Sequence, residues 1–112
     1  MFGVFTGALP EAPAPAPAPA PTGLQERMRS AFTADLPRRR AELQAALDAD
    51  DLDGAGRLLH GMRGSAGYLG EDGLYTLCGE LEREADAGRL DSVRRRLPQL
   101  LALLARFEAS TV

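Results

Sequence analysis

The 112-residue sequence predicts an all-α fold, namely an antiparallel up-down four-helix bundle preceded by a disordered tail rich in proline and alanine. Three observations predict it. Apolar residues after residue 23 recur at helical spacings of three, four or seven, acidic or glycine-containing breaks divide this part into four segments, and no alternating strand pattern competes. Amphipathic helices with short connections pack most simply as a bundle. We therefore expect residues 24–112 to form one domain and residues 1–23 to lie outside it.

The tail differs in composition from everything after it. Proline and alanine alternate between residues 10 and 21, where six of the eight prolines lie. Proline fixes φ and lacks an amide donor, so this stretch predicts a solvated polyproline-II spacer. Residues 1–9 are apolar, but they are too few to span a membrane and lack the basic start of a signal peptide. We interpret the tail as disordered or as part of an interdomain linker, with a docking site for a proline-reading partner as the alternative.

The first two predicted helices are separated by an acidic break. The first helix begins near residue 24 and should be disturbed at Pro37, because proline removes an intrahelical hydrogen bond. Residues 48–53 are rich in aspartate, and either Asp50 or Asp51 can cap the second helix.

The last two predicted helices are separated by glycine and aspartate. Residues 67–72 predict a turn and a new helix N-terminus, and Gly88 is expected to end the third helix. Asp91 can cap the fourth helix, in which Pro98 should introduce a kink or a looser turn. The residues expected to face the core are Leu24, Met28, Phe32, Leu36, Leu43, Leu47, Leu52, Ala55, Leu59, Met62, Ala66, Leu74, Leu77, Cys78, Leu81, Ala85, Val93, Leu97, Leu100, Leu101, Leu104 and Phe107.

The composition excludes several classes of function. The chain has no lysine, asparagine, isoleucine or tryptophan, and it has one histidine, His60, and one cysteine, Cys78. A lone thiol excludes an intramolecular disulfide framework and fits a reducing compartment, and one residue of each kind cannot form a zinc site of Cys and His ligands. Without lysine there is no P-loop and no Schiff base. A formal net charge of −3, with arginines spread along the chain, argues against nucleic-acid binding.

His60 is the one candidate catalytic histidine, and its neighbours are unusual. At about 100° per residue it points roughly 120° away from the centre of the apolar stripe of its helix, so it is expected to face outward. Gly56 and Gly64 lie one turn on either side and remove side-chain bulk, although glycine disfavours a helix. Arg57 and Arg63, each three residues away, add positive charge. A mostly neutral imidazole between two arginines could receive an anion such as a phosphoryl group. The alternative interpretation is an ordinary surface histidine without a function.

The segment from His60 to Gly70, HGMRGSAGYLG, resembles the signature of histidine-containing phosphotransfer (HPt) domains. That signature runs His, any residue, apolar, Lys or Arg, Gly, two small residues, two of any kind, apolar, Gly. The likeness extends over about residues 24–107. It implies a four-helix bundle that relays phosphoryl groups between response-regulator receiver domains in bacterial two-component signalling.

The resemblance also implies roles for individual residues. His60 would be the phosphorylated residue, and Arg63, where the family usually has lysine, would assist the phosphoryl group electrostatically. Gly64 would clear room for the partner, and Glu82 would orient the imidazole. Gly79, one turn before Glu82, is expected to let its helix approach His60 closely.

Helical spacing and the resemblance together predict the surface that receives the partner. It would consist of Gly56, Arg57, Gly64 and Gly67 around His60, and of Tyr68, whose alternative role is to cover the end of the bundle. The resemblance also implies partners and cofactors. Partners would be receiver domains and a hybrid histidine kinase, with no nucleic acid and no membrane insertion, and the chain would be a cytoplasmic monomer. No cofactor is expected on this chain, and Mg²⁺ is expected in the partner receiver. The chain would have no ATP-dependent kinase activity of its own, because a kinase domain needs an asparagine-bearing box.

Two other functions remain open from the sequence. The chain can be a non-catalytic helical interaction module that binds receivers, in which His60 is incidental. It can also be the first domain of a larger chemotaxis-type or hybrid histidine kinase, to which the tail would be the linker.

Overall fold

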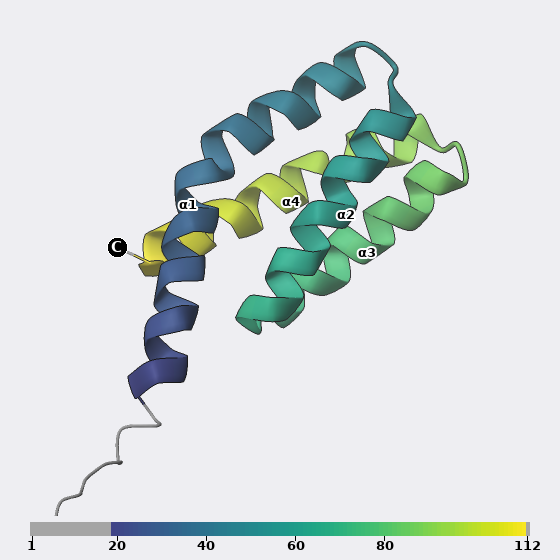
Figure 1. The fold of residues 1–112 in the computed structure, drawn as a ribbon. Coiled ribbons are helices and arrows are strands. Elements are labelled where there is room, and N and C mark those ends of the chain that lie inside the picture. Colours follow the sequence, from purple (N-terminus) through teal and green to yellow (C-terminus); the bar gives the residue numbers. More distant parts are fainter. Residues whose placement is uncertain (1–18, 112) are drawn as a thin grey trace, which may run out of the picture.

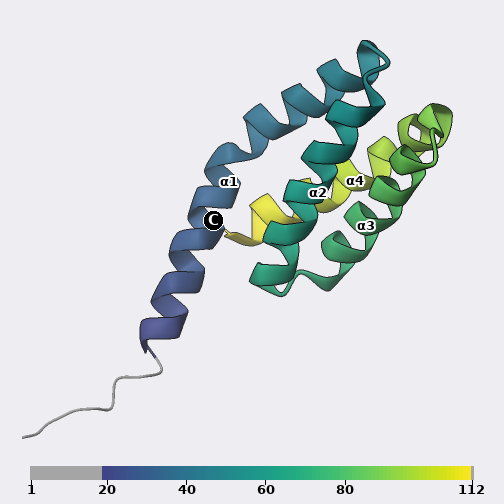
Figure 2. The same cartoon turned by 45° about the vertical axis from the view of Figure 1, so that its right-hand side comes forward.

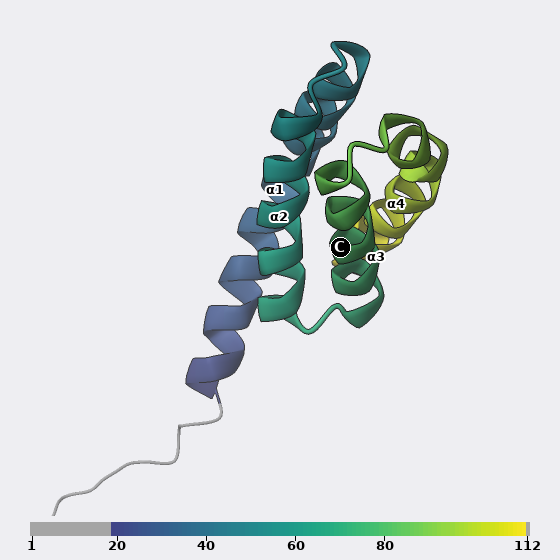
Figure 3. The same ribbon diagram turned by 90° about the vertical axis from the view of Figure 1, so that its right-hand side faces the viewer.

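The computed structural model describes residues 19–111, which form a bundle of four helices (Figure 1). They are α1 (Pro19–Asp48), α2 (Leu52–Leu69), α3 (Asp72–Asp86) and α4 (Leu90–Thr111). Connections of two or three residues make successive helices antiparallel, and each helix packs against two others. Figure 3 shows α1 and α2 as one layer and α3 and α4 as the other. The predicted all-α bundle is confirmed.

Helix α1 begins at Pro19, five residues before the predicted start, so the expected boundary at residue 23 falls inside a helix. The amides of a first helical turn have no intrahelical carbonyl to bind, so proline is tolerated there. Figure 2 shows this end of α1 projecting beyond the rest of the bundle. Leu24 lies on it and is 44% exposed, so its expected core position is wrong. The predicted disordered tail otherwise falls on residues 1–18, outside the described residues.

The two internal prolines do not end their helices. α1 continues through Pro37 and α4 continues through Pro98. Figure 1 shows α1 changing direction along its length, as expected where a proline ring meets the carbonyl four residues earlier.

The helix ends show which capping predictions hold. Asp51 caps α2, and its carboxylate accepts a hydrogen bond of 2.9 Å from the Gly54 amide. The predicted turn over 67–72 is too long, because α2 continues to Leu69 and ends at Gly70, whose φ of 73° suits glycine. Asp91 is not the cap of α4, which already includes Leu90. The extra turn of α2 determines where Tyr68 lies.

The core runs the length of the bundle and is apolar throughout the described residues. All four helices contribute to it, and Leu69 joins it although the sequence did not assign it there. The expected core residues Met28, Leu52 and Leu101 are only partly buried against this core. The buried residues are Phe32, Leu36, Leu43, Leu47, Ala55, Leu59, Met62, Ala66, Leu69, Leu74, Leu77, Cys78, Leu81, Ala85, Val93, Leu97, Leu100, Leu104 and Phe107.

Cys78 should be chemically inert in the folded protein. Burial, aided by the nearby Glu82 carboxylate, raises the pKa of its thiol to about 12. About one molecule in ten thousand would therefore carry the reactive thiolate at pH 8. We expect no reaction with Ellman's reagent in buffer and one thiol per chain in 6 M guanidinium, read at 412 nm. Stoichiometric labelling of the folded protein within minutes would contradict this assignment.

Candidate functional site

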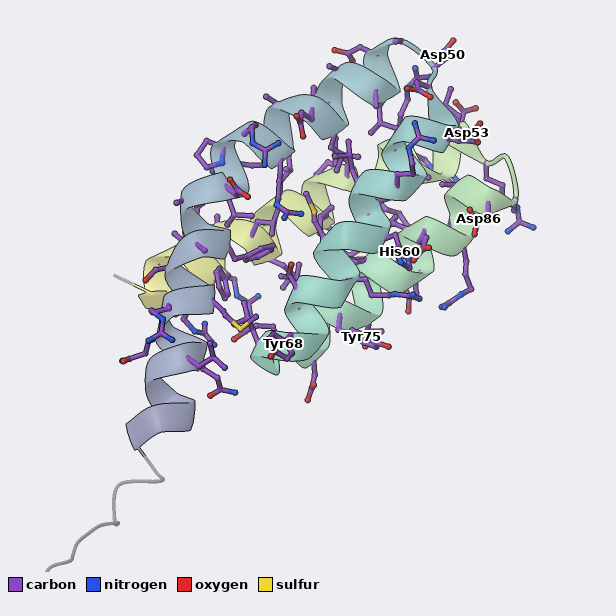
Figure 4. All side chains as sticks on the ribbon, viewed as in Figure 1. Asp50, Asp53, His60, Tyr68, Tyr75 and Asp86 are labelled. Atoms are coloured by element: carbon purple, nitrogen blue, oxygen red, sulfur yellow. The ribbon has the colours of Figure 1, made fainter. Side chains whose placement is uncertain are left out.

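His60 lies on the outer face of α2, with its side chain 63% exposed. The face opposite is the buried stripe of α2, which contains Leu59 and Met62 and holds the helix against the core. Because these apolar residues fix the rotation of the helix about its axis, the imidazole is directed away from the bundle interior. The expectation that His60 faces outward is therefore confirmed, and Figure 4 shows it between α2 and α3.

Glu82 on α3 contacts the imidazole directly. Its Oε2 lies 2.9 Å from His60 Nδ1, within hydrogen-bond distance. The glutamate side chain is only 17% exposed, because it lies between the two helices. An ionised carboxylate can only accept a hydrogen bond, so this contact at 2.9 Å, closer than the 3.4 Å approach of Arg63 Nη2 to the same nitrogen, favours the proton on Nδ1 and leaves Nε2 unprotonated in the neutral ring.

Arg63 joins the same group, one turn after His60 on α2. Its Nη1 lies 3.4 Å from Glu82 Oε1, and its Nη2 lies 3.4 Å from His60 Nδ1. The guanidinium is therefore on the Nδ1 side of the ring, beside the carboxylate. Glu82 Oε1 is buried and has no hydrogen-bond partner within normal geometry, so Arg63 is the cation that balances this oxygen.

Gly79 is close to Arg63, which differs from the expected role of this glycine. A Cβ placed on Gly79 would lie 3.4 Å from Arg63 Cδ and 3.7 Å from Arg83 Nη1. Gly79 is itself buried. The space that this glycine leaves on α3 is therefore occupied by the side chain of Arg63 rather than by the helix of His60.

The two glycines on either side of His60 have different surroundings. A Cβ on Gly64 would meet nothing within 4 Å, so this glycine leaves open surface beside the imidazole. A Cβ on Gly56 would lie 3.7 Å from Ala85 Cβ and 3.9 Å from Asp86 Oδ1, at the end of α3. Both were expected to clear space for a partner, yet Gly56 also lies against a neighbouring helix.

A shallow depression adjoins the imidazole on the side of Gly56. His60, Glu82 and Arg57 line it together with Asp53 and Asp86. Arg57 is exposed and forms no ion pair with any residue in the described range 19–111. Sequence reasoning missed the two aspartates, although helical spacing was a signal for both. Asp53 precedes His60 by seven residues, and Asp86 follows Glu82 by four.

Two exposed tyrosines lie at the opposite end of this face. Tyr68 is 60% exposed and Tyr75 is 47% exposed. A Cβ on Gly67 would lie 3.0 Å from the Tyr75 ring, so this glycine lets the ring lie against α2. Figure 4 shows both tyrosines at one end of the α2–α3 face, with Asp53 and Asp86 toward the other and His60 between them. Tyr75 was not predicted from the sequence.

The described residues were also compared with what a metal site or a membrane-spanning helix requires. Within residues 19–111 no group of three or more His, Cys, Asp or Glu side chains could bind a metal ion. None of the four helices in this range is both long and apolar enough to cross a membrane.

Comparison with known proteins identifies the family. The Hpt domain family model matches residues 27–110, which include α2 and α3 entirely, most of α1 and α4, and the His60, Arg63 and Glu82 group. Searches of curated proteins and of solved structures gave no significant match. Domains of this family carry out histidine phosphotransfer in two-component phosphorelays and interact with receiver domains and histidine kinases. Because the match spans most of the sequence and includes residues of all four helices, this chain belongs to the Hpt domain family.

Proposed function

We propose that this chain relays a phosphoryl group between the aspartates of response-regulator receiver domains, with His60 as the residue that carries it. The observation that supports this most strongly is the combination of an exposed imidazole and the Glu82 contact at Nδ1. Together they present Nε2 to a docking protein with its lone pair free. An incidental surface histidine needs no partly buried carboxylate behind it.

The transfer step follows from this arrangement. The Nε2 lone pair attacks the phosphorus of a receiver phospho-aspartate, an N–P bond forms, and the P–O bond to the aspartate breaks as the carboxylate leaves. The proton remains on Nδ1, and the ring becomes a phospho-imidazolium. Glu82, 2.9 Å from Nδ1, stabilises the positive charge that develops there, much as an aspartate supports the histidine of a hydrolase triad. A second receiver aspartate then takes the phosphoryl group by the reverse step.

Two arginines supply positive charge at the site. Arg57 lines the depression beside His60 and is not engaged in an ion pair within the described residues, so its guanidinium is free to bond a phosphoryl oxygen or a partner carboxylate. Arg63 lies on the Nδ1 side of the ring, and from there its positive charge attracts the phosphoryl group at longer range.

The docking surface we propose extends along α2 on both sides of His60. Gly64 leaves the surface open, Gly56 and Arg57 border the depression, and Gly67 and Tyr68 lie toward the far end. Tyr68 and Tyr75 provide exposed aromatic area of the kind that often anchors protein interfaces. The receiver would bring the Mg²⁺ ion and its acidic pocket, and a hybrid histidine kinase can present such a receiver. We further propose that the chain works in the cytoplasm as a monomer.

The test is phosphotransfer with purified components. Receivers carrying ³²P-phosphoaspartate and Mg²⁺ are mixed with the chain, without ATP. We expect label to move to this chain within minutes, to survive alkali and to be lost in acid, as expected for a phosphoramidate. If no receiver passes label to the chain although several bind it, the chain is a non-catalytic receiver-binding module and the proposed transfer is wrong.

A further inference from the structure

We propose that Gly79 is a positioning residue for His60. By leaving space on α3 for Arg63, it lets the guanidinium pair with Glu82 and so holds the imidazole in the tautomer whose Nε2 is free. The proposal deepens the proposed function and rests on it for its effect on transfer, whereas its effect on the tautomer stands apart from it.

The first step is the contact between Gly79 and Arg63. Gly79 lies inside α3, where glycine weakens a helix relative to alanine, and neither a turn nor a positive φ requires it there. A Cβ would already be 3.4 Å from Arg63 Cδ, so a larger side chain would occupy the volume that the Arg63 stem now fills. A methyl group at residue 79 would just touch the Arg63 stem, whereas a longer side chain would compete with Arg63 for its place across α3.

The second step is the pairing of Arg63 with Glu82. Arg63 Nη1 lies 3.4 Å from Glu82 Oε1, an oxygen that is buried and has no hydrogen-bond partner among the described residues. A buried carboxylate oxygen without a nearby cation is unfavourable, so a displaced Arg63 would leave Glu82 to turn toward water.

The third step links Glu82 to the chemistry. The other carboxylate oxygen, Oε2, lies 2.9 Å from His60 Nδ1 and holds the proton there. If the carboxylate turned away, nothing on that side would favour protonated Nδ1, and part of the population would carry its proton on Nε2. That fraction has no lone pair on Nε2 and cannot attack phosphorus. Gly79 therefore acts on the imidazole through two intervening residues, Arg63 and Glu82.

The experiment measures the tautomer and the transfer rate separately. ¹⁵N NMR of the His60 ring, followed over a pH series until the ring is neutral, reports which nitrogen carries the proton. Gly79→Leu is compared with Gly73→Leu, a matched control on α3 where an added Cβ would meet nothing within 4 Å. Arg63→Ala and the double variant Gly79→Leu/Arg63→Ala complete a double-mutant cycle. Glu82→Ala gives the reference tautomer ratio of the His60 ring when no carboxylate contacts Nδ1.

We expect Gly79→Leu and Arg63→Ala to shift the ring toward the Nε2–H tautomer, as Glu82→Ala does, and the double variant to shift it no further. Transfer from the phospho-receiver should fall by about tenfold, the lower end of the cost of losing an outer partner of a functional histidine. Gly73→Leu should change neither. An unchanged tautomer in Arg63→Ala, or fully additive shifts in the cycle, would overturn the proposal, and the first of these can be read even if Gly79→Leu does not fold. Absence of transfer in the parent chain, with the tautomer shifts as expected, would refute the proposed function alone.

Discussion

His60→Gln is expected to abolish phosphotransfer while leaving the bundle folded. Glutamine has no nucleophilic ring nitrogen, and the chain has no second histidine that could replace it. Since the His60 side chain is 63% exposed and contacts Glu82 and Arg63 rather than the core, the free energy of unfolding should change by about 0.5 kcal/mol or less. The measurements are ³²P label on the chain after incubation with a phospho-receiver and a thermal melt followed by circular dichroism.

The control for this variant is Arg95→Gln, which removes an exposed arginine on α4 with no ion pair among the described residues. It should accept label at the parent rate. Acid-labile label on His60→Gln at the parent level would place the phosphoryl group elsewhere and exclude His60 as its carrier.

Gly64→Leu is expected to make the protein more stable and less active. The added side chain meets nothing within 4 Å at its Cβ, and leucine favours a helix over glycine, so the free energy of unfolding should rise by up to about 1 kcal/mol. The same side chain would stand one turn from His60 on the proposed docking surface and keep the receiver away. We expect transfer to fall by about a hundredfold, equivalent to about 2.7 kcal/mol.

The opposite signs of these two effects separate docking from folding. Gly73→Leu, at another open glycine on an exposed part of α3, serves as the control and should leave transfer unchanged. Stability comes from urea unfolding, and the transfer rate comes from the time course of labelling. A Gly64→Leu chain that accepts phosphoryl at the parent rate would show that no receiver covers this part of α2.

Much of the bundle could be predicted because helix period and burial are local properties of the sequence. The stripe containing Leu59 and Met62 was predicted from spacing alone, and it sets the outward direction of His60. Boundaries were less predictable. Pro19 belongs to α1 and Gly67 to α2, because a first turn tolerates proline and a helix tolerates glycine when neighbouring elements pack against it.

The site was predictable in its members more than in its arrangement. His60, Arg63 and Glu82 were all named from the sequence, the glutamate through the family resemblance. Their mutual geometry depends on how α2 and α3 pack, and so does the presence of Asp53, Asp86 and Tyr75 along the same face.

The periodicity of apolar residues was enough to predict a four-helix bundle and one outward-facing histidine, because the rotation of an amphipathic helix follows from which of its residues are apolar. Which residues contact the imidazole of that histidine depends instead on how the helices pack against each other. The packing of α3 against α2 brings Glu82 to 2.9 Å from Nδ1 and places Arg63 over Gly79. These contacts join residues about twenty positions apart, and their distances depend on the spacing of two helices, which no periodicity within one helix encodes.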